Sequence, residues 1–199
     1  MSEEKKFNNA KKVVEILGRV KKTSKVLFLT DQETEKNREY LTSSLVNSRC
    51  VLKHIQIETA KSHGSELPEK IAEEMKLVDL VIGLTKGNIT HTRARKDAQK
   101  EGVHVIALPE SHLVNFFLAN GWNCDFEKTK PQIEKLAQAL TDADRARVHT
   151  EDGTDIEMSI KGRNGRALTG YGNSIDVSAG YCLESSLALS KEQRMALLW

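Results

Sequence analysis

Residues 25–31, KVLFLTD, form an almost continuous apolar run that ends in the polar pair Thr30 and Asp31. Two later stretches have the same character, LVDLVIGLT at residues 77–85 and VHVIALP at residues 103–109. Strands that are covered on both faces of a sheet read as such runs, whereas half-buried strands alternate apolar with polar residues. The three stretches therefore predict the interior of a sheet that is buried on both sides.

Helical patterns separate these strands along the chain. Helices are expected at residues 11–21, 34–46, 66–75 and 91–100, and a fourth strand, CVLKHIQIE, is expected at residues 50–58. Because four strand-then-helix units follow one another, we predict an α/β domain: a Rossmann-like or flavodoxin-like parallel sheet with helices on both faces. We place the end of this layered domain near Asp144, so that it spans residues 1–144.

Two further helices are expected between the last of these strands and the domain boundary. Residues 110–126 place Leu113, Phe116, Phe117 and Leu118 on one helical face. Pro131 is expected to open the second helix, PQIEKLAQALTDA, because proline is favoured in the first turn. These two helices would cap the sheet.

The remainder of the chain, residues 145–199, reads as a β-hairpin-rich start of a second domain. Two strands, RVHTE and TDIEMSIKG, flank Asp152-Gly153, a dipeptide that suits a tight turn. Ile156, Met158 and Ile160 alternate with polar residues, which predicts one buried face and one solvated face. Five glycines between residues 162 and 180 indicate a segment that turns sharply and approaches other backbone closely.

Composition excludes several classes of protein. The 30 basic and 28 acidic residues are mixed along the chain, so neither nucleic acid nor a membrane surface is expected as a partner. Cys50, Cys124 and Cys182 are widely spaced, which argues against a disulfide framework and a Cys-rich zinc site.

No apolar run has signal-peptide or transmembrane length, so the protein is expected to be cytoplasmic. No glycine-rich phosphate loop follows the first strand, which argues against a nucleotide site.

Histidines and a helix start are the remaining candidates for local chemistry. His54 and His104 fall in strands and His63, His112 and His149 in or beside loops; none has the spacing of paired metal ligands, so we interpret them as structural. The run THTRAR at residues 90–95 begins a helix at the edge where α/β sheets bind ligands. That run predicts either an anion site or an ordinary N-cap with solvated arginines.

The run TEDGTDIEMSIKGR at residues 150–163, the loop GNSIDVSAG at residues 172–180 and Glu184 together resemble the aminopeptidase T (leucyl aminopeptidase) family of metallopeptidases. The resemblance implies hydrolysis of N-terminal peptide bonds of a peptide substrate with divalent zinc, cobalt or manganese. It also implies that Glu184 is a metal ligand. The other ligands of that family lie beyond the matching positions, so we expect a truncated chain with an incomplete metal site that does not retain the metal.

Two alternatives stay open. Enzymes that cleave a dihydroxypyridine ring with iron(II) and dioxygen resemble the same family, and iron would prefer two histidines and one carboxylate. The other alternative is a folded fragment without catalysis, which tight stoichiometric binding of Zn²⁺, Mn²⁺ or Fe²⁺ would contradict. A homo-oligomer is compatible with either.

The last residues, LSKEQRMALLW at 189–199, depart from the family-like text that precedes them. Residues 188–199 can be encoded by codons that, in a shifted frame, read Pro-Val-Glu-Gly-Thr-Thr-Asn-Gly-Thr-Ile-Val, which continues the pattern. We therefore expect this tail to be aberrant, the product of a frameshift, and its apolar side chains to be exposed or buried only by self-association. The nucleotide sequence around codon 188 tests the idea.

Overall fold

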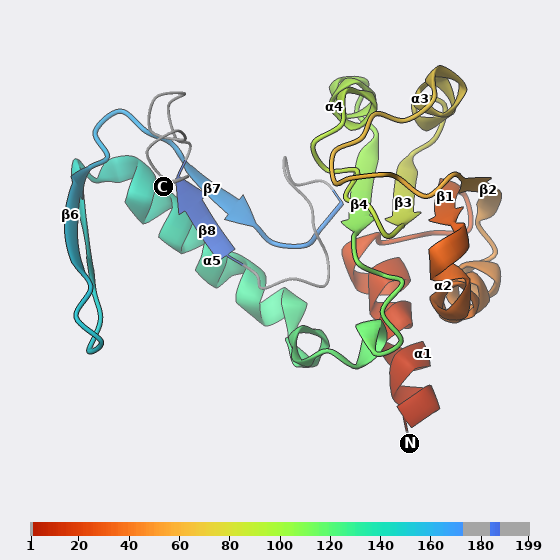
Figure 1. Ribbon diagram of the computed structural model, residues 1–199, viewed down its shortest axis with the longest axis horizontal. Coiled ribbons are helices and arrows are strands. Elements are labelled where there is room, and N and C mark those ends of the chain that lie inside the picture. Colours follow the sequence, from red (N-terminus) through yellow and green to blue (C-terminus); the bar gives the residue numbers. More distant parts are fainter. Residues whose placement is uncertain (1, 173–183, 188–199) are drawn as a thin grey trace. The chain divides into compact units, whose positions relative to one another are not determined.

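The computed structural model describes residues 2–172 and 184–187, the latter for the backbone alone (Figure 1). The described residues fall into two compact units, one of residues 2–126 and 170–172 and one of residues 127–169 and 184–187. The aberrant tail predicted for residues 189–199 lies outside the described residues. The domain boundary that we expect near Asp144 stays a prediction.

The first unit is built on a four-stranded parallel sheet in the order β2-β1-β3-β4. This sheet confirms the predicted α/β class, and its order corresponds to the start of the flavodoxin-like order 2-1-3-4-5. The pairing aligns Val26 with Leu52 on one side and with Leu80 on the other. The strands are β1 (Lys25–Asp31), β2 (Val51–Ile57), β3 (Leu80–Leu84) and β4 (His104–Leu108).

Helices cover both faces of this sheet, as the apolar strands predict. On one face, Leu27 and Val81 share a core with Met75 of α3 and Ala98 of α4. The opposite face carries Phe28, which is buried, as are Ala10 of α1 and Leu41 of α2. The helices are α1 (Ser2–Lys12), which continues as a π-helical turn (Val13–Leu17), α2 (Glu35–Ser48), α3 (Glu69–Met75) and α4 (Arg93–Lys100).

The segment after β4 departs from the predicted helix. It forms two short 3-10 helices, Phe116–Leu118 and Asn120–Asn123, and Leu113 is exposed. Hydrogen bonds from α1 hold the backbone of this segment: Asn9 Nδ2 donates to Phe117 O at 2.7 Å, and Lys12 Nζ donates to Trp122 O. The expected helical face was wrong because aromatic packing and these bonds to α1 replace the regular bonds of a helix.

The second unit contains one long helix and two antiparallel hairpins. The helix α5 begins at Phe126, so Pro131 lies inside it and does not open it. Gly153, at φ +102°, forms the tight turn between β5 and β6 that Asp152-Gly153 predicts. The elements are α5 (Phe126–Asp142), β5 (Arg145–His149), β6 (Asp155–Ser159), β7 (Gly165–Leu168) and β8 (Glu184–Leu187).

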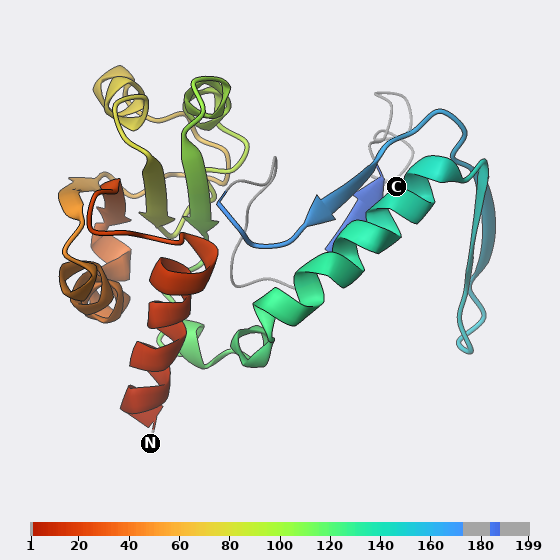
Figure 2. The same ribbon diagram turned by 180° about the vertical axis from the view of Figure 1, so that it is seen from behind.

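The β5–β6 hairpin does not have the buried face that its sequence predicts. Ile160 is 1% exposed, but Ile156 and Met158 are 52% and 37% exposed. Figure 2 shows the hairpin projecting beyond the end of α5. Alternation identifies which side chains share a face of a strand, but whether that face is covered depends on residues far away in the sequence.

The glycine-rich segment brings the chain back to the first unit. Gly172 O accepts a hydrogen bond from Val105 N of β4 at 3.0 Å, and Gly172 N donates to Leu17 O at 3.3 Å. A side chain at Gly172 would have its Cβ 3.3 Å from His104 Cβ, tighter than most such contacts. Close backbone approach, which the glycine density predicts, is therefore found at this position.

The described helices include none that combines the length and the apolar composition required to span a membrane.

Candidate functional site

The carboxyl ends of the strands gather the polar residues of the first unit. All four strands are parallel, so their carboxyl ends meet at one edge, and the sheet order reverses between β1 and β3. Open α/β sheets bind ligands in the crevice that this reversal creates. A cavity of about 240 Å³ lies there, lined by Asp31, Thr85 and residues 57–61, 65–68 and 87–89.

Asp31, the last residue of β1, fixes the geometry of this edge. Its Oδ1 accepts hydrogen bonds from Glu33 N and Thr34 N, at 3.1 and 3.2 Å. Its Oδ2 accepts a 2.8 Å bond from Lys86 N in the loop after β3. Because Asp31 is 2% exposed and three backbone donors satisfy its carboxylate, it serves to join two loops and not to contact a ligand.

Two histidines and one carboxylate come together beside this cavity. His63 Nε2 lies 3.0 Å from Glu110 Oε1, and His112 Nδ1 lies 3.6 Å from Glu110 Oε2. Glu110 has the left-handed φ of +59°, which non-glycine residues adopt at a cost of order 1 kcal/mol or more. The buried His112 Nδ1 has no hydrogen-bond partner among the described residues.

These residue types are those of an iron(II) site, but their hydrogen bonds oppose that role. His63 Nδ1 accepts a 3.1 Å hydrogen bond from Asn88 N, so in the neutral ring Nε2 carries the proton, 3.0 Å from Glu110 Oε1. A ring nitrogen that carries a proton cannot ligate a metal. Within residues 2–172, no three His, Cys, Asp or Glu side chains are grouped suitably to hold a metal ion. We interpret His63 as a link between the loops after β2, β3 and β4.

This cluster was not found from the sequence. The sequence places His63 and His112 in or beside loops, but their separation gives no ligand spacing. The one available signal was position, since each residue follows a strand and parallel strands end at the same edge.

Residues 90–95, for which the sequence predicts either an anion site or an N-cap, form an N-cap. Thr92 Oγ1 accepts a 3.2 Å hydrogen bond from Arg95 N. Arg93 N donates at 2.9 Å to both carboxylate oxygens of Glu66, so this chain's own carboxylate occupies the positive end of α4. Arg95 is 7% exposed and its Nε donates to Thr90 O at 2.6 Å, which does not fit a solvated arginine.

Glu184, the predicted metal ligand, opens β8 and is aligned with Leu168 of β7. The description there is limited to the backbone, and the preceding residues 173–183 lie outside the described residues. The role of Glu184 therefore stays a prediction.

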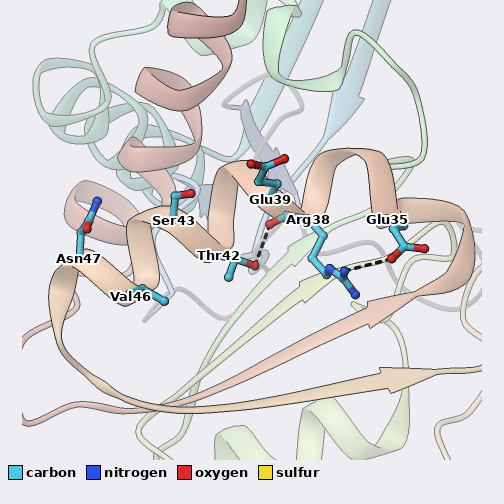
Figure 3. Close-up of a pocket in the computed structure, with 7 residues that line it drawn as sticks. All are labelled: Glu35, Arg38, Glu39, Thr42, Ser43, Val46 and Asn47. Atoms are coloured by element: carbon cyan, nitrogen blue, oxygen red, sulfur yellow. Dashed lines mark hydrogen bonds and ion pairs between the residues drawn. The ribbon is translucent and has the colours of Figure 1, made fainter.

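A larger surface hollow of about 630 Å³ runs along one side of α2 (Figure 3). All seven residues that line it belong to this one helix. Glu35 and Arg38 form an ion pair at 3.0 Å, and Thr42 Oγ1 donates to Arg38 O at 2.9 Å. A site needs polar groups that converge from several elements, so this surface is a weaker candidate than the cavity at the strand ends.

Comparisons with known proteins support the fold. No protein-family model matches the chain, and neither does any curated protein. A solved structure of 2,5-dihydroxypyridine dioxygenase from Pseudomonas putida KT2440 is similar, with a TM-score of 0.65 and 14% sequence identity. The alignment covers 84% of this chain and 51% of the dioxygenase, so the chain spans about half the length of that protein. At this identity the likeness concerns the fold alone.

The comparisons overturn the expected membership of the aminopeptidase T family. The fold matches that of a dioxygenase, and the family models and curated proteins offer no peptidase. The expectation of a metalloprotease or other hydrolase was therefore wrong. Its basis was the hairpin sequence at residues 150–163, a glycine-rich loop and one glutamate, a pattern that constrains backbone turns more than it defines a catalytic set of side chains.

Proposed function

We infer that this chain forms part of an iron(II)-dependent dioxygenase that cleaves the ring of a dihydroxypyridine. The observation that carries this inference is the likeness to 2,5-dihydroxypyridine dioxygenase over 84% of the chain. Fold alone does not define chemistry, because the same architecture hosts unrelated activities. The inference therefore needs a direct test of metal binding and turnover.

The described residues do not fit an iron site. Non-haem iron(II) oxygenases hold the metal with two histidines and one carboxylate, and leave positions open for substrate and dioxygen. His63, Glu110 and His112 have the right chemical types, but His63 Nδ1 accepts the Asn88 N–H, which leaves the ring proton on Nε2. We therefore propose the Glu184 carboxylate as one metal ligand and assign no histidine ligand, because all six histidines of the chain lie among the described residues, which hold no grouped set of ligands.

Oxygen uptake by the purified chain with iron(II) and 2,5-dihydroxypyridine tests this function. Uptake is expected with loss of the ring's ultraviolet absorption, and Glu184→Gln should lower both iron content and uptake. Ser185→Ala is a matched control on the same strand and should leave both unchanged. Absence of oxygen uptake with the iron-loaded chain would overturn the proposal.

The alternative of a folded fragment without catalysis predicts that no metal binds. A folded fragment without catalysis would bind none of Zn²⁺, Mn²⁺ and Fe²⁺ tightly, because the described residues contain no grouped set of ligands. Calorimetric titration with each metal separates the two functions. Stoichiometric binding of iron that Glu184→Gln abolishes would exclude the fragment.

A further inference from the structure

The cavity at the reversal of strand order has the size of a site for one small ring. Its volume of about 240 Å³ is below the range of about 300–1,000 Å³ typical of sites for drug-sized ligands. It is bounded by the ends of three strands and by two loops that hydrogen bonds hold together. Gly64 N donates to Asn88 O at 2.9 Å, and Asn88 N donates to His63 Nδ1.

Apolar side chains provide much of the cavity wall. Ile89 is 4% exposed, so this part of the wall is backed by the core and does not face bulk solvent. An apolar wall favours a ring or a short hydrocarbon over a strongly hydrated ligand. The apolar wall consists of Ile57, Ala60, Leu67, Pro68 and Ile89.

Three hydrogen-bond donors on the wall have no partner among the described residues. They are the Thr59 hydroxyl, the Lys61 ammonium and the Asn88 amide nitrogen Nδ2. Asn88 Oδ1 accepts a 2.8 Å bond from Thr90 N, which fixes the carboxamide so that its nitrogen remains available. These donors would pair with acceptor oxygens of a ligand.

Charge on the wall decides between a neutral and an anionic ligand. The carboxylates of Asp31, Glu58 and Glu66 outnumber the single ammonium of Lys61. Backbone donors hold Asp31 and Glu66 in place, because Lys86 N bonds Asp31 and Arg93 N bonds Glu66. Like charges across an interface are unfavourable, so this excess of negative charge disfavours an anion.

We propose that this cavity binds a small uncharged ring that carries acceptor oxygens. The apolar wall contacts the ring, and Thr59 and Asn88 donate to the oxygens. A dihydroxypyridine belongs to this class of ring, but binding here requires neither a metal nor dioxygen, so it can be tested independently of the proposed dioxygenase function.

Titration of the ¹⁵N-labelled full chain with 2-pyridone, a neutral ring with one acceptor oxygen, tests the proposal by NMR. Saturable shifts are expected at the amides of residues 59, 60, 87 and 88. Thr59→Val should weaken binding about two- to tenfold, the effect of one lost hydrogen bond. Asn88→Asp keeps the acceptor for Thr90 N but removes both donors and adds a carboxylate, so its loss should be larger.

Two controls make the result decisive. Thr42→Val, in the hollow on α2, should bind 2-pyridone as the unchanged protein does, because its hydroxyl bonds within its own helix. Benzoate, a ring of similar size with a negative charge, should bind more weakly than 2-pyridone. Shifts that do not saturate, equal binding of benzoate, or unchanged affinity in Asn88→Asp would overturn the proposal. The spectrum of each variant reports that it is folded.

Discussion

At the scale of single residues, histidines show how a hydrogen-bond partner selects a chemical state. His54 Nε2 lies 2.8 Å from Thr30 Oγ1, and its ring is 5.3 Å from that of Phe28. Burial, and to a smaller extent the positive charge of Arg38, lowers the pKa of His54 from the ordinary value of 6.5. His63 instead accepts a backbone N–H, which its protonated ring could not do.

An NMR titration of His54 should give a pKa below 6.5. A histidine with a lowered pKa binds fewer protons folded than unfolded, so it favours the folded state fully above pH 6.5. That contribution is lost as the pH falls through the folded pKa. Arg38→Gln should raise the pKa slightly and Phe28→Leu more, because burial is the larger cause. A pKa at or above 6.5 in the unchanged protein would contradict this assignment.

His63 should be found as the Nε2–H tautomer. Asn88 N donates to Nδ1, which is therefore the unprotonated nitrogen of the neutral ring, so the ring proton lies on Nε2. The ¹⁵N shifts of the ring distinguish the tautomers at a pH where the ring is neutral. His149, an exposed residue of β5 whose ring has no hydrogen bond among the described residues, is the reference. An Nδ1–H tautomer at His63 would show that the Asn88 bond does not form.

At the scale of elements, the sequence predicted which segments are helices and strands better than it predicted what packs against them. The four strands and the helices between them were predicted because continuous apolar runs and helical periodicity are local signals. The cluster of His63, Glu110 and His112 was not, because it depends on which loops meet. The same limit applies to the β5–β6 hairpin, whose turn at Gly153 was predicted correctly and whose buried face was not.

Two isoleucines of one alternating run test the burial of the hairpin. Ile160→Ala should lower the free energy of unfolding by about 2–5 kcal/mol, because Ile160 is 1% exposed. Ile156→Ala should change it by less than about 1 kcal/mol, because Ile156 is 52% exposed. Urea unfolding of the two variants, followed by circular dichroism, compares them directly. Equal losses would mean that the hairpin face is covered in solution.

At the scale of the whole molecule, the chain leaves the first unit at α5 and returns to it at residues 170–172. Tyr171 is 2% exposed, and the Arg19 guanidinium lies 5.1 Å from the centre of its ring. Gly172 then bonds to Val105 N at the edge of β4. A strand edge left without partners is exposed to solvent and to other chains, so this return protects one side of the sheet.

A chain cut at residue 144 should therefore keep the sheet but lose stability. It lacks Tyr171 and Gly172, and removing a buried aromatic side chain costs about 3–5 kcal/mol. Hydrogen exchange at the amides of Val81 and Ile82, in the centre of the sheet, reports the stability of the first unit alone. Exchange there should be faster in the cut chain than in the full chain, and Val105 should lose protection most because its acceptor is gone.

Tyr171→Ala in the full chain should reproduce much of the loss at Val81 and Ile82, which separates the effect of the return from that of the missing second unit. Equal protection in the cut and full chains would show that residues 1–144 form a complete domain and that the return segment adds nothing to it.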